Sequence, residues 1–320
     1  MKKQNLFSIL LLVCSFTFVG CSDDDDSTSD AMDDSTIAEI VIESENYSSL
    51  EAALIKADLV TTLSGDTEYT VFAPDNDAFA EFLSDNGFNS LEDVPTDVLK
   101  QVLLNHVIQG EVESDEISTG YVTNLAVEET SQANLSMYLD TSNGVTINGE
   151  VAVVNADIDA ENGVIHAVDK VIALPTVVTF ATADPNFSIL VNALTREDSF
   201  SYVSTLSTPA GSSPAPFTVF APTNDAFADL LAELEVSDLS DIDTETLAAT
   251  LNMHVIAGAN VRAEDLTSGD VTTLGGDVTI NESNATITDA NGRVSTVIVT
   301  NVQATNGVVH AIDKVILPAL

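Results

Sequence analysis

The second half of this 320-residue chain repeats its first half. Residues 69–79 read Tyr-Thr-Val-Phe-Ala-Pro-Asp-Asn-Asp-Ala-Phe, and residues 217–227 repeat them with two substitutions. Residues 162–172 (Asn-Gly-Val-Ile-His-Ala-Val-Asp-Lys-Val-Ile) return in the same way at 306–316. The offsets of 148 and 144 positions are far longer than a solenoid repeat, so each copy must be a domain with its own hydrophobic core.

The repeat also places the boundary between the domains. Pro175 follows the second block of the first copy, and Pro318 stands at the matching place near the end of the chain. We therefore predict a first domain over residues 35–175 and a second over residues 176–320. Hydrophobic residues make up 45% of the chain, which is enough apolar surface to fold two cores despite a net charge of −42.

That negative charge excludes one class of partner. Nucleic-acid binding depends on Lys and Arg that neutralise phosphates, and this chain has 9 such residues against 51 Asp and Glu. Peripheral binding to anionic lipid is disfavoured for the same reason.

The first part of each copy has helical periodicity. Residues 33–65 carry apolar side chains at helical spacing. Asp75 and Thr223 follow the proline of the first block and can cap a helix, and Thr96 and Thr244 can cap the next one.

The later part of each copy reads as strands and turns. From about Tyr121 the apolar residues alternate, and Asn-Gly pairs at 143–144 and 148–149 flank a short apolar stretch, which is a hairpin pattern. We predict an α+β fold in which helices come first and antiparallel strands follow.

The N-terminus reads as an export signal. Residues 1–20 combine two lysines with an apolar run that is too short to span a bilayer. Residues 18–21 (Phe-Val-Gly-Cys) resemble a bacterial lipobox, which implies lipid attachment at Cys21; an ordinary secretory signal is the alternative. Residues 21–34 form an acidic Ser/Asp tether that resembles the surface-export signal of Bacteroidota lipoproteins, or is a plain spacer. We expect an exported outer-membrane lipoprotein exposed at the cell surface.

The other cysteine, Cys14, lies inside the export signal. The two predicted domains therefore contain no cysteine, so they must be stable without disulfides. Thiol catalysis and cysteine metal sites are excluded for the same reason.

The two repeated blocks resemble the signature blocks of the fasciclin domain, and they occur twice in the same order. The resemblance implies two tandem fasciclin-like domains, each a wedge-shaped antiparallel β-sandwich with a helical layer. It also implies a role in adhesion or matrix contact. The residues of the family motifs, for which we expect structural roles, are Pro74, Asn76, His106, His166, Asp169, Pro222, Asn224, His254, His310 and Asp313.

The four histidines occupy equivalent positions in the two copies. In some fasciclin proteins, Tyr-His and Asp-Ile pairs near these blocks are proposed to contact integrins. Here Asn105 precedes His106 and Met253 precedes His254, and a lysine follows each block aspartate, so that motif does not carry over. His166 lies in a segment that is apolar on both faces, and we expect it to be a hydrogen-bonded core residue.

Catalytic motifs are absent from the sequence. It has no Gly-x-Ser-x-Gly, His-Glu-x-x-His, P-loop or dinucleotide fingerprint, so we predict no enzyme activity and no cofactor. Residues 157–163 resemble the start of an EF-hand loop, but the glycine comes one place late and Val168 stands where the bidentate Glu belongs. We expect at most weak binding of divalent cations by the acidic surface.

The sequence thus predicts a non-enzymatic, lipid-anchored module for cell-surface adhesion or for contact with extracellular matrix or biofilm. Its expected partner is a surface or matrix protein or a polysaccharide. One alternative is a carbohydrate-binding accessory lipoprotein of a glycan-capture system, although the chain has no Trp and 5 Tyr to stack on sugars. A second alternative is a structural envelope protein with no specific ligand.

Overall fold

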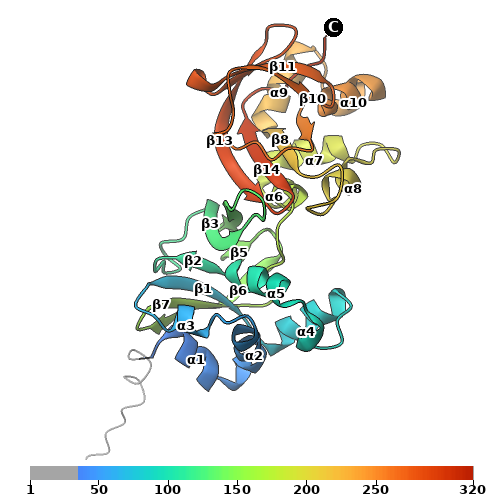
Figure 1. Cartoon of the computed structure of the whole chain (residues 1–320). Helices are drawn as coiled ribbons and strands as arrows, with labels where there is room; N and C mark the ends of the chain where they lie inside the picture. Colours follow the sequence, from blue (N-terminus) through green and yellow to red (C-terminus); the bar gives the residue numbers. More distant parts are fainter. Residues whose placement is uncertain (1–34, 320) are drawn as a thin grey trace, which may run out of the picture.

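The computed structural model describes residues 35–319. The predicted export signal (1–20), Cys21 and the tether (21–34) lie outside the described residues. Two domains follow each other along the chain (Figure 1), and each combines a seven-stranded sheet with several helices. The predicted α+β class and the tandem arrangement are confirmed. Within residues 35–319, every helix is too short or too polar to cross a membrane.

The elements of domain 1 are α1 (Ile37–Glu43), η1 (Glu45–Tyr47), α2 (Ser48–Lys56), α3 (Val60–Leu63), β1 (Tyr69–Pro74), α4 (Asn76–Asp85), η2 (Leu91–Asp93), α5 (Thr96–Leu104), β2 (Val107–Gln109), β3 (Gly120–Val127), β4 (Asn134–Asp140), β5 (Thr146–Ile147), β6 (Val151–Ala160) and β7 (Gly163–Val168). The elements of domain 2 are α6 (Val177–Ala183), η3 (Pro185–Phe187), α7 (Ser188–Leu194), α8 (Tyr202–Leu206), β8 (Phe217–Pro222), α9 (Asn224–Glu233), η4 (Leu239–Asp241), α10 (Thr244–Asn252), β9 (Val255–Ala257), β10 (Gly269–Thr273), β11 (Gly276–Asn281), η5 (Glu282–Asn284), β12 (Thr286–Thr288), β13 (Val294–Ala304) and β14 (Gly307–Ile312).

Side-chain caps fix where several helices begin. In α4 the Asp75 carboxylate accepts a hydrogen bond from the Ala78 N–H at 2.8 Å. In α9 the Thr223 hydroxyl accepts one from the Ala226 N–H at 3.3 Å. Both predicted caps are confirmed, and each follows the proline that ends the preceding strand.

The caps predicted at Thr96 and Thr244 are wrong by one position. Both threonines are the first residues of their helices, α5 and α10, and the capping positions belong to Pro95 and Asp243. Asp243 accepts a hydrogen bond from the Thr246 N–H at 2.9 Å, and Asp is a better cap than Thr. Pro95 lacks an N–H and has a restricted φ, which suits the start of a helix.

The sheet is mixed, whereas the sequence predicted antiparallel strands throughout. Its order in domain 1 is β2-β1-β7-β6-β5-β4-β3, and β1 pairs with β7 in parallel, with Tyr69 opposite Gly163 and Pro74 opposite Val168. The other pairs are antiparallel, and the segment with the predicted hairpin pattern forms β5, which pairs with β4 and β6. Parallel pairing requires a crossover connection, and the long segment from α4 to β6 supplies it. The two signature blocks thus become neighbouring parallel strands in the sheet of each domain.

Close approach of these two strands explains the glycine that opens the second block. Gly163 has φ +132°, and a side chain there would collide with the backbone oxygen of Tyr69. Gly307 has φ +156° and would collide with the backbone of Phe217 in the same way. Only glycine fits a position with both a positive φ and a neighbouring strand in contact.

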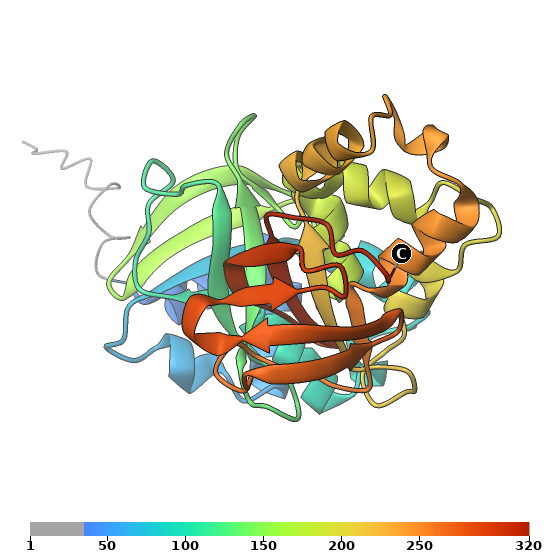
Figure 2. The ribbon, with the colours of Figure 1, turned by 90° about the horizontal axis from the view of Figure 1, so that it is seen from above.

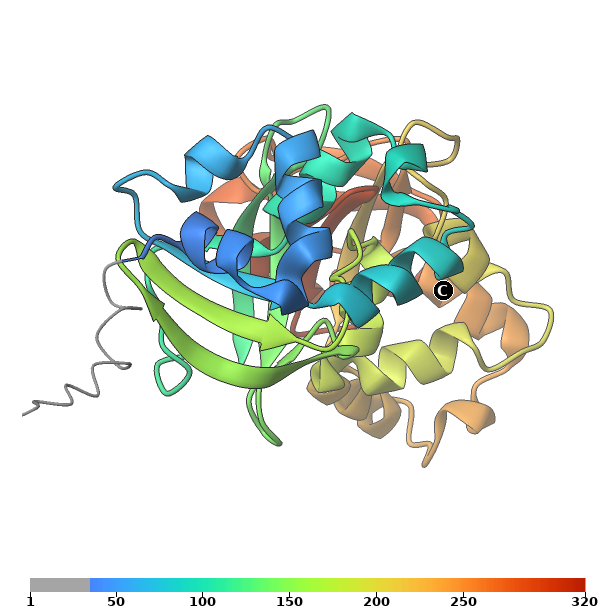
Figure 3. The same ribbon diagram turned by 90° about the horizontal axis from the view of Figure 1, so that it is seen from below.

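Each domain has two hydrophobic cores. In domain 1, Val71 and Ala73 of β1 point to the helices, and Phe72 points to the opposite side. On that opposite side Phe72 contacts buried residues of β4, β5 and β7, so the sheet bends and its two halves enclose the second core. In Figure 2 the strands of domain 2 (orange to red) lie on one side and its helices on the other; Figure 3 shows the helices of domain 1 in front of its sheet.

Candidate functional site

The asparagine of the first signature block ties the helix that it begins to the preceding helical segments. The Asn76 Oδ1 accepts a hydrogen bond from the Ser49 N–H (2.8 Å), and its Nδ2 donates to the Glu45 carbonyl (2.8 Å). Asn224 makes the corresponding bonds to Ile189 and Pro185, both at 2.9 Å. The prolines that precede them, Pro74 and Pro222, are buried ends of β1 and β8. Both asparagine side chains are thus used in hydrogen bonds within their own domain, and both prolines are buried.

His106 and His254 join the end of a helix to the last segment of each domain. The His106 Nδ1 lies 2.7 Å from the Val102 carbonyl, and its Nε2 accepts a hydrogen bond from the Ile172 N–H at 2.8 Å. His254 repeats this arrangement with Thr250 and Ile316. Desolvation lowers the pKa of both histidines to about 4, so the rings are neutral at pH 7 and Nδ1 carries the proton.

His166 and His310 are the fully buried histidines of the second signature block. The His166 Nδ1 accepts from the Asp157 N–H at 3.2 Å, so its Nε2 carries the proton toward the Val112 carbonyl at 3.0 Å. His310 makes the same two contacts with Asn301 and Val261. Burial lowers the pKa of His310. Each of the four histidines therefore uses both ring nitrogens for backbone hydrogen bonds.

Asp169 and Asp313 follow β7 and β14, and each holds the neighbouring antiparallel strand, β6 or β13. The Asp169 Oδ1 accepts a hydrogen bond from the Ala152 N–H at 2.8 Å, and Asp313 does the same for Thr296 at 2.6 Å. Like the histidines and asparagines, these aspartates are spread through the domains and do not meet in one cavity. In the part of the chain that the structure describes, no three His, Cys, Asp or Glu residues are arranged to hold a metal ion.

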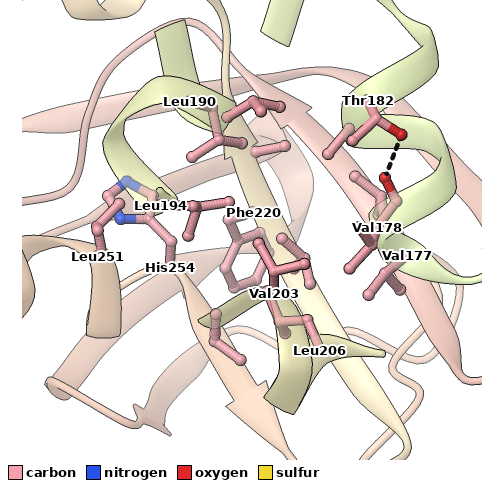
Figure 4. A pocket seen from close by; sticks show the side chains of 16 residues that line it. Val177, Val178, Thr182, Leu190, Leu194, Val203, Leu206, Phe220, Leu251 and His254 are labelled. Carbon is pink, nitrogen blue, oxygen red and sulfur yellow. Dashed lines mark hydrogen bonds between the residues drawn. The ribbon is translucent and has the colours of Figure 1, made fainter. Parts of the chain in front are cut away.

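Domain 2 contains a small apolar cavity of about 40 Å³ between α6, α7, α8 and the sheet (Figure 4). Its two polar side chains, Thr182 and His254, are hydrogen-bonded to the carbonyls of Val178 and Thr250. Ala181 lines the cavity at the position where domain 1 has the fully buried Val41. The cavity offers an incoming ligand no free polar group, and we interpret it as a packing gap.

The two domains meet in a seam whose centre is aromatic. Tyr121 of β3 packs against Tyr138 of β4, with 5.0 Å between ring centroids, and edge-on against Phe180 of α6 at 5.7 Å. The Tyr121 hydroxyl donates to Asp184 of domain 2 at 3.0 Å. Burial, and then the charge of Asp184, raises the pKa of Tyr121, so its hydroxyl remains a donor.

A polar network continues the seam along β13. The N–H of Gln303, a fully buried residue, donates to the Ser136 Oγ of domain 1 at 2.9 Å. Its side chain accepts from Arg262 (2.9 Å) and donates to Asn260 (3.2 Å). Asn260 in turn donates to Glu128 of domain 1 at 3.4 Å. Buried polar groups that are this well paired favour one relative placement of the two domains.

Two clefts flank the seam. One, of about 440 Å³, lies between α5 and the β3–β4 loop of domain 1 and residues Ala210 and Thr305 of domain 2. The other, of about 370 Å³, has Tyr121, Asp184 and Asn224 in its wall. Both are open to solvent and have mixed polar and apolar walls, which suits contacts with a macromolecule better than enclosure of a small molecule.

No repeated motif of the sequence marks the seam. Its residues are those that the two copies do not share: Asp270 replaces Tyr121, and Thr279 replaces Tyr138, at the matching positions of β10 and β11. A comparison of the copies that looked for differences, instead of repeats, would have pointed to them.

Known proteins resemble this chain along most of its length. Protein sll1483 of Synechocystis sp. is 37% identical over 140 residues, which cover 44% of this chain and 74% of that protein. Transforming growth factor-beta-induced protein ig-h3 of Sus scrofa is 29% identical over 261 residues (80% of this chain, 35% of that protein). Human periostin is 26% identical over 288 residues (89% and 31%). The chain therefore spans about a third of those two animal proteins.

A solved structure of a FAS1 domain pair, from the insect cell adhesion molecule fasciclin I, aligns with a TM-score of 0.47 and 19% identity over 83% of this chain and 92% of that one. The family profile described as the fasciclin domain matches residues 45–175 and 185–318. The two matched ranges of this profile cover most of the chain, and each includes both signature blocks. The chain therefore belongs to the fasciclin-domain family, with two tandem copies of the domain.

Proposed function

We propose that this protein is a non-enzymatic adhesion module of the cell surface, which contacts extracellular matrix or biofilm material through the outer faces of its two domains. Adhesion is the role that its family membership indicates. The observation that carries the proposal is the use of the signature residues. Their side chains serve internal hydrogen bonds, and a seam joins the two domains, so the outer faces and loops are left for partners.

The chemistry of the histidines supports a role without catalysis. Histidine is the most common general base near neutral pH, and all four histidines here are buried and hydrogen-bonded to the backbone. We propose no cofactor. Weak binding of divalent cations by the acidic surface remains part of the proposal, at the millimolar affinity of surface carboxylates.

We further propose that a lipid on Cys21 anchors the protein in the outer membrane, with the acidic tether holding the domains away from the surface. Cys21→Ser should move the protein from the membrane fraction to the soluble fraction. Protease treatment of intact cells should remove the wild-type domains. Domains that stay protected would contradict surface display.

A pull-down from native surface material with the purified protein tests the adhesion role. We expect capture of a matrix protein or polysaccharide. Glycan-array binding that survives high salt would favour the carbohydrate-binding alternative. Failure to retain any surface component would favour a structural envelope protein with no specific ligand.

A further inference from the structure

Domain 2 uses β13 and the loop after β9 to contact domain 1, and domain 1 has the same face with no domain packed against it. On β13, Gln303 and Ala304 are completely buried by the seam. Their counterparts on β6 are Asp159, which is exposed, and Ala160, which is partly exposed. β5 pairs with β6 at Val151 and Ala152, and the Val153 N–H donates to the Val145 carbonyl. From Val154 onward, the edge of β6 that faces away from β7 has no strand paired with it among residues 35–319 (Figure 3). Just beyond β6, the Glu161 N–H donates to the Ser35 carbonyl at 2.9 Å.

Shared hydrogen bonds establish which residues correspond. In both domains the threonine of the first strand binds the N–H of the valine after the loop glycine, at 2.9 Å from Val112 in domain 1 and from Val261 in domain 2. Two residues further on, the Ser114 N–H donates to Asp157 in domain 1 and the Ala263 N–H donates to Asn301 in domain 2. Three positions carry the polar network in domain 2, Asn260, Arg262 and Gln303, and Thr305 beside them donates to the Pro175 carbonyl. The counterparts of these four positions in domain 1 are Glu111, Glu113, Asp159 and Glu161.

Every one of these four counterparts is a carboxylate, and all four are exposed. We call them the β6 acidic face. Partial desolvation, and then the charges of Asp115, Asp157 and Asp159, raise the pKa of Glu113, which shows how closely the negative charges gather. Beside them Val154 is 63% exposed at the start of the unpaired edge. The face therefore combines an open strand edge, an apolar side chain and four negative charges.

Two occupants from the chain itself are disfavoured, namely the tether and a second copy of the chain. The tether would bring four consecutive aspartates (23–26) against the four carboxylates. A second copy of the chain has its β4 surface already occupied by its own domain 2, through the bond from Gln303 to Ser136. The matching surface of domain 2 carries the exposed Asp270 and Asp277, which would repel the face.

We propose that the β6 acidic face is a docking surface for a basic, extended segment of a partner protein, which adds to the edge of β6 and pairs its Lys or Arg side chains with the four carboxylates. An open strand edge accepts such a segment through main-chain hydrogen bonds, and side-chain charges supply specificity. The inference deepens the proposed adhesion role and rests on it for the origin of the partner.

The test uses the purified protein and a labelled peptide that alternates Lys and Thr, at physiological salt. One variant neutralises the face: Glu111→Gln, Glu113→Gln, Asp159→Asn and Glu161→Gln. The matched control neutralises four exposed carboxylates of domain 2: Asp265→Asn, Asp270→Asn, Asp277→Asn and Glu282→Gln. We expect the Kd to rise about tenfold or more in the face variant, from four lost ion pairs, and to change less than about twofold in the control.

Two further readouts separate strand addition from general attraction to an acidic protein. The peptide should slow hydrogen exchange in β6, and a version with Pro at alternate positions should bind more weakly because it lacks backbone donors. Equal losses of affinity in the face variant and the control, or protection that omits β6, would overturn the inference. The peptide assay reports on this face alone, so its failure is distinct from failure of the adhesion role, which the attachment of cells reports.

Discussion

The buried histidines make the stability of each domain depend on pH in a calculable way. His106 has a pKa of about 4 in the folded protein, against 6.5 for an unperturbed histidine, because its ring is fully desolvated. The unfolded state therefore binds more protons between these two values. The contribution of the neutral His106 to the free energy of unfolding is complete above about pH 7. It decreases as the pH falls through 6.5 and is lost at about pH 4.

Between pH 7 and pH 5, His106 should cost domain 1 about 2 kcal/mol of stability, at about 1.4 kcal/mol for each factor of ten in proton affinity. His254 should cost domain 2 a similar amount, because its pKa is also about 4. The change to test is His106→Gln, which removes the titrating ring. The variant should be less stable at pH 7, since it loses two buried hydrogen bonds, but its stability should depend less on pH.

Urea unfolding at pH 7 and pH 5, followed by circular dichroism, measures both effects. From pH 7 to pH 5, the free energy of unfolding of domain 1 should fall by about 2 kcal/mol more in the wild type than in His106→Gln. His254→Gln is the matched control, because it should change only the transition of domain 2. Carboxylates titrate in all three proteins and cancel in the comparison. Equal losses in the wild type and His106→Gln would refute the assignment of a neutral, buried His106.

Three other predictions concern packing and charge. Gly163→Ala should destabilise domain 1 by about 3 kcal/mol or more in urea unfolding, because the new side chain would collide with Tyr69. Gly144 also has a positive φ but has open space around it, so Gly144→Ala should cost about 1 kcal/mol. Equal costs would contradict the close approach of β1 and β7. Ala181→Val should raise the stability of domain 2 by up to about 1 kcal/mol, because the larger side chain fills the cavity. The reverse change at the matching position of domain 1, Val41→Ala, should cost about 2 kcal/mol. Destabilisation by Ala181→Val would show that the cavity has no room for two methyl groups. The melting temperature should rise between low salt and about 0.15 M NaCl, where screening acts over about 8 Å, because the net charge of −42 repels itself; a flat or falling melting temperature would contradict this.

Local features of the fold were predictable from the sequence. Asp75 and Thr223 cap their helices because a short polar side chain after a strand-ending proline satisfies the first free N–H groups, which is a property of a few adjacent residues. The burial of His166 followed from a strand that is apolar on both faces. The pairing of β1 with β7 was not predictable in the same way, because it joins segments about 90 residues apart and no local pattern specifies its direction.

The seam between the domains was still harder to predict from the sequence. Gln303 and Ser136 are ordinary surface residues in the pattern of their strands, and only the docked position of the two domains makes them a buried pair. Tyr121 and Asp184 gave no signal for the same reason, since their bond spans two domains. Interfaces of this kind follow from three-dimensional complementarity, for which a single sequence holds indirect information.

Our central proposal is that this fasciclin-family chain acts in adhesion. Attachment of the source cells to a surface coated with their own matrix, with and without the gene, tests it most directly. We predict that deletion reduces both attachment and biofilm mass, and that the full chain supplied from a plasmid restores them. Normal attachment and normal biofilm in the deletion strain would contradict the claim.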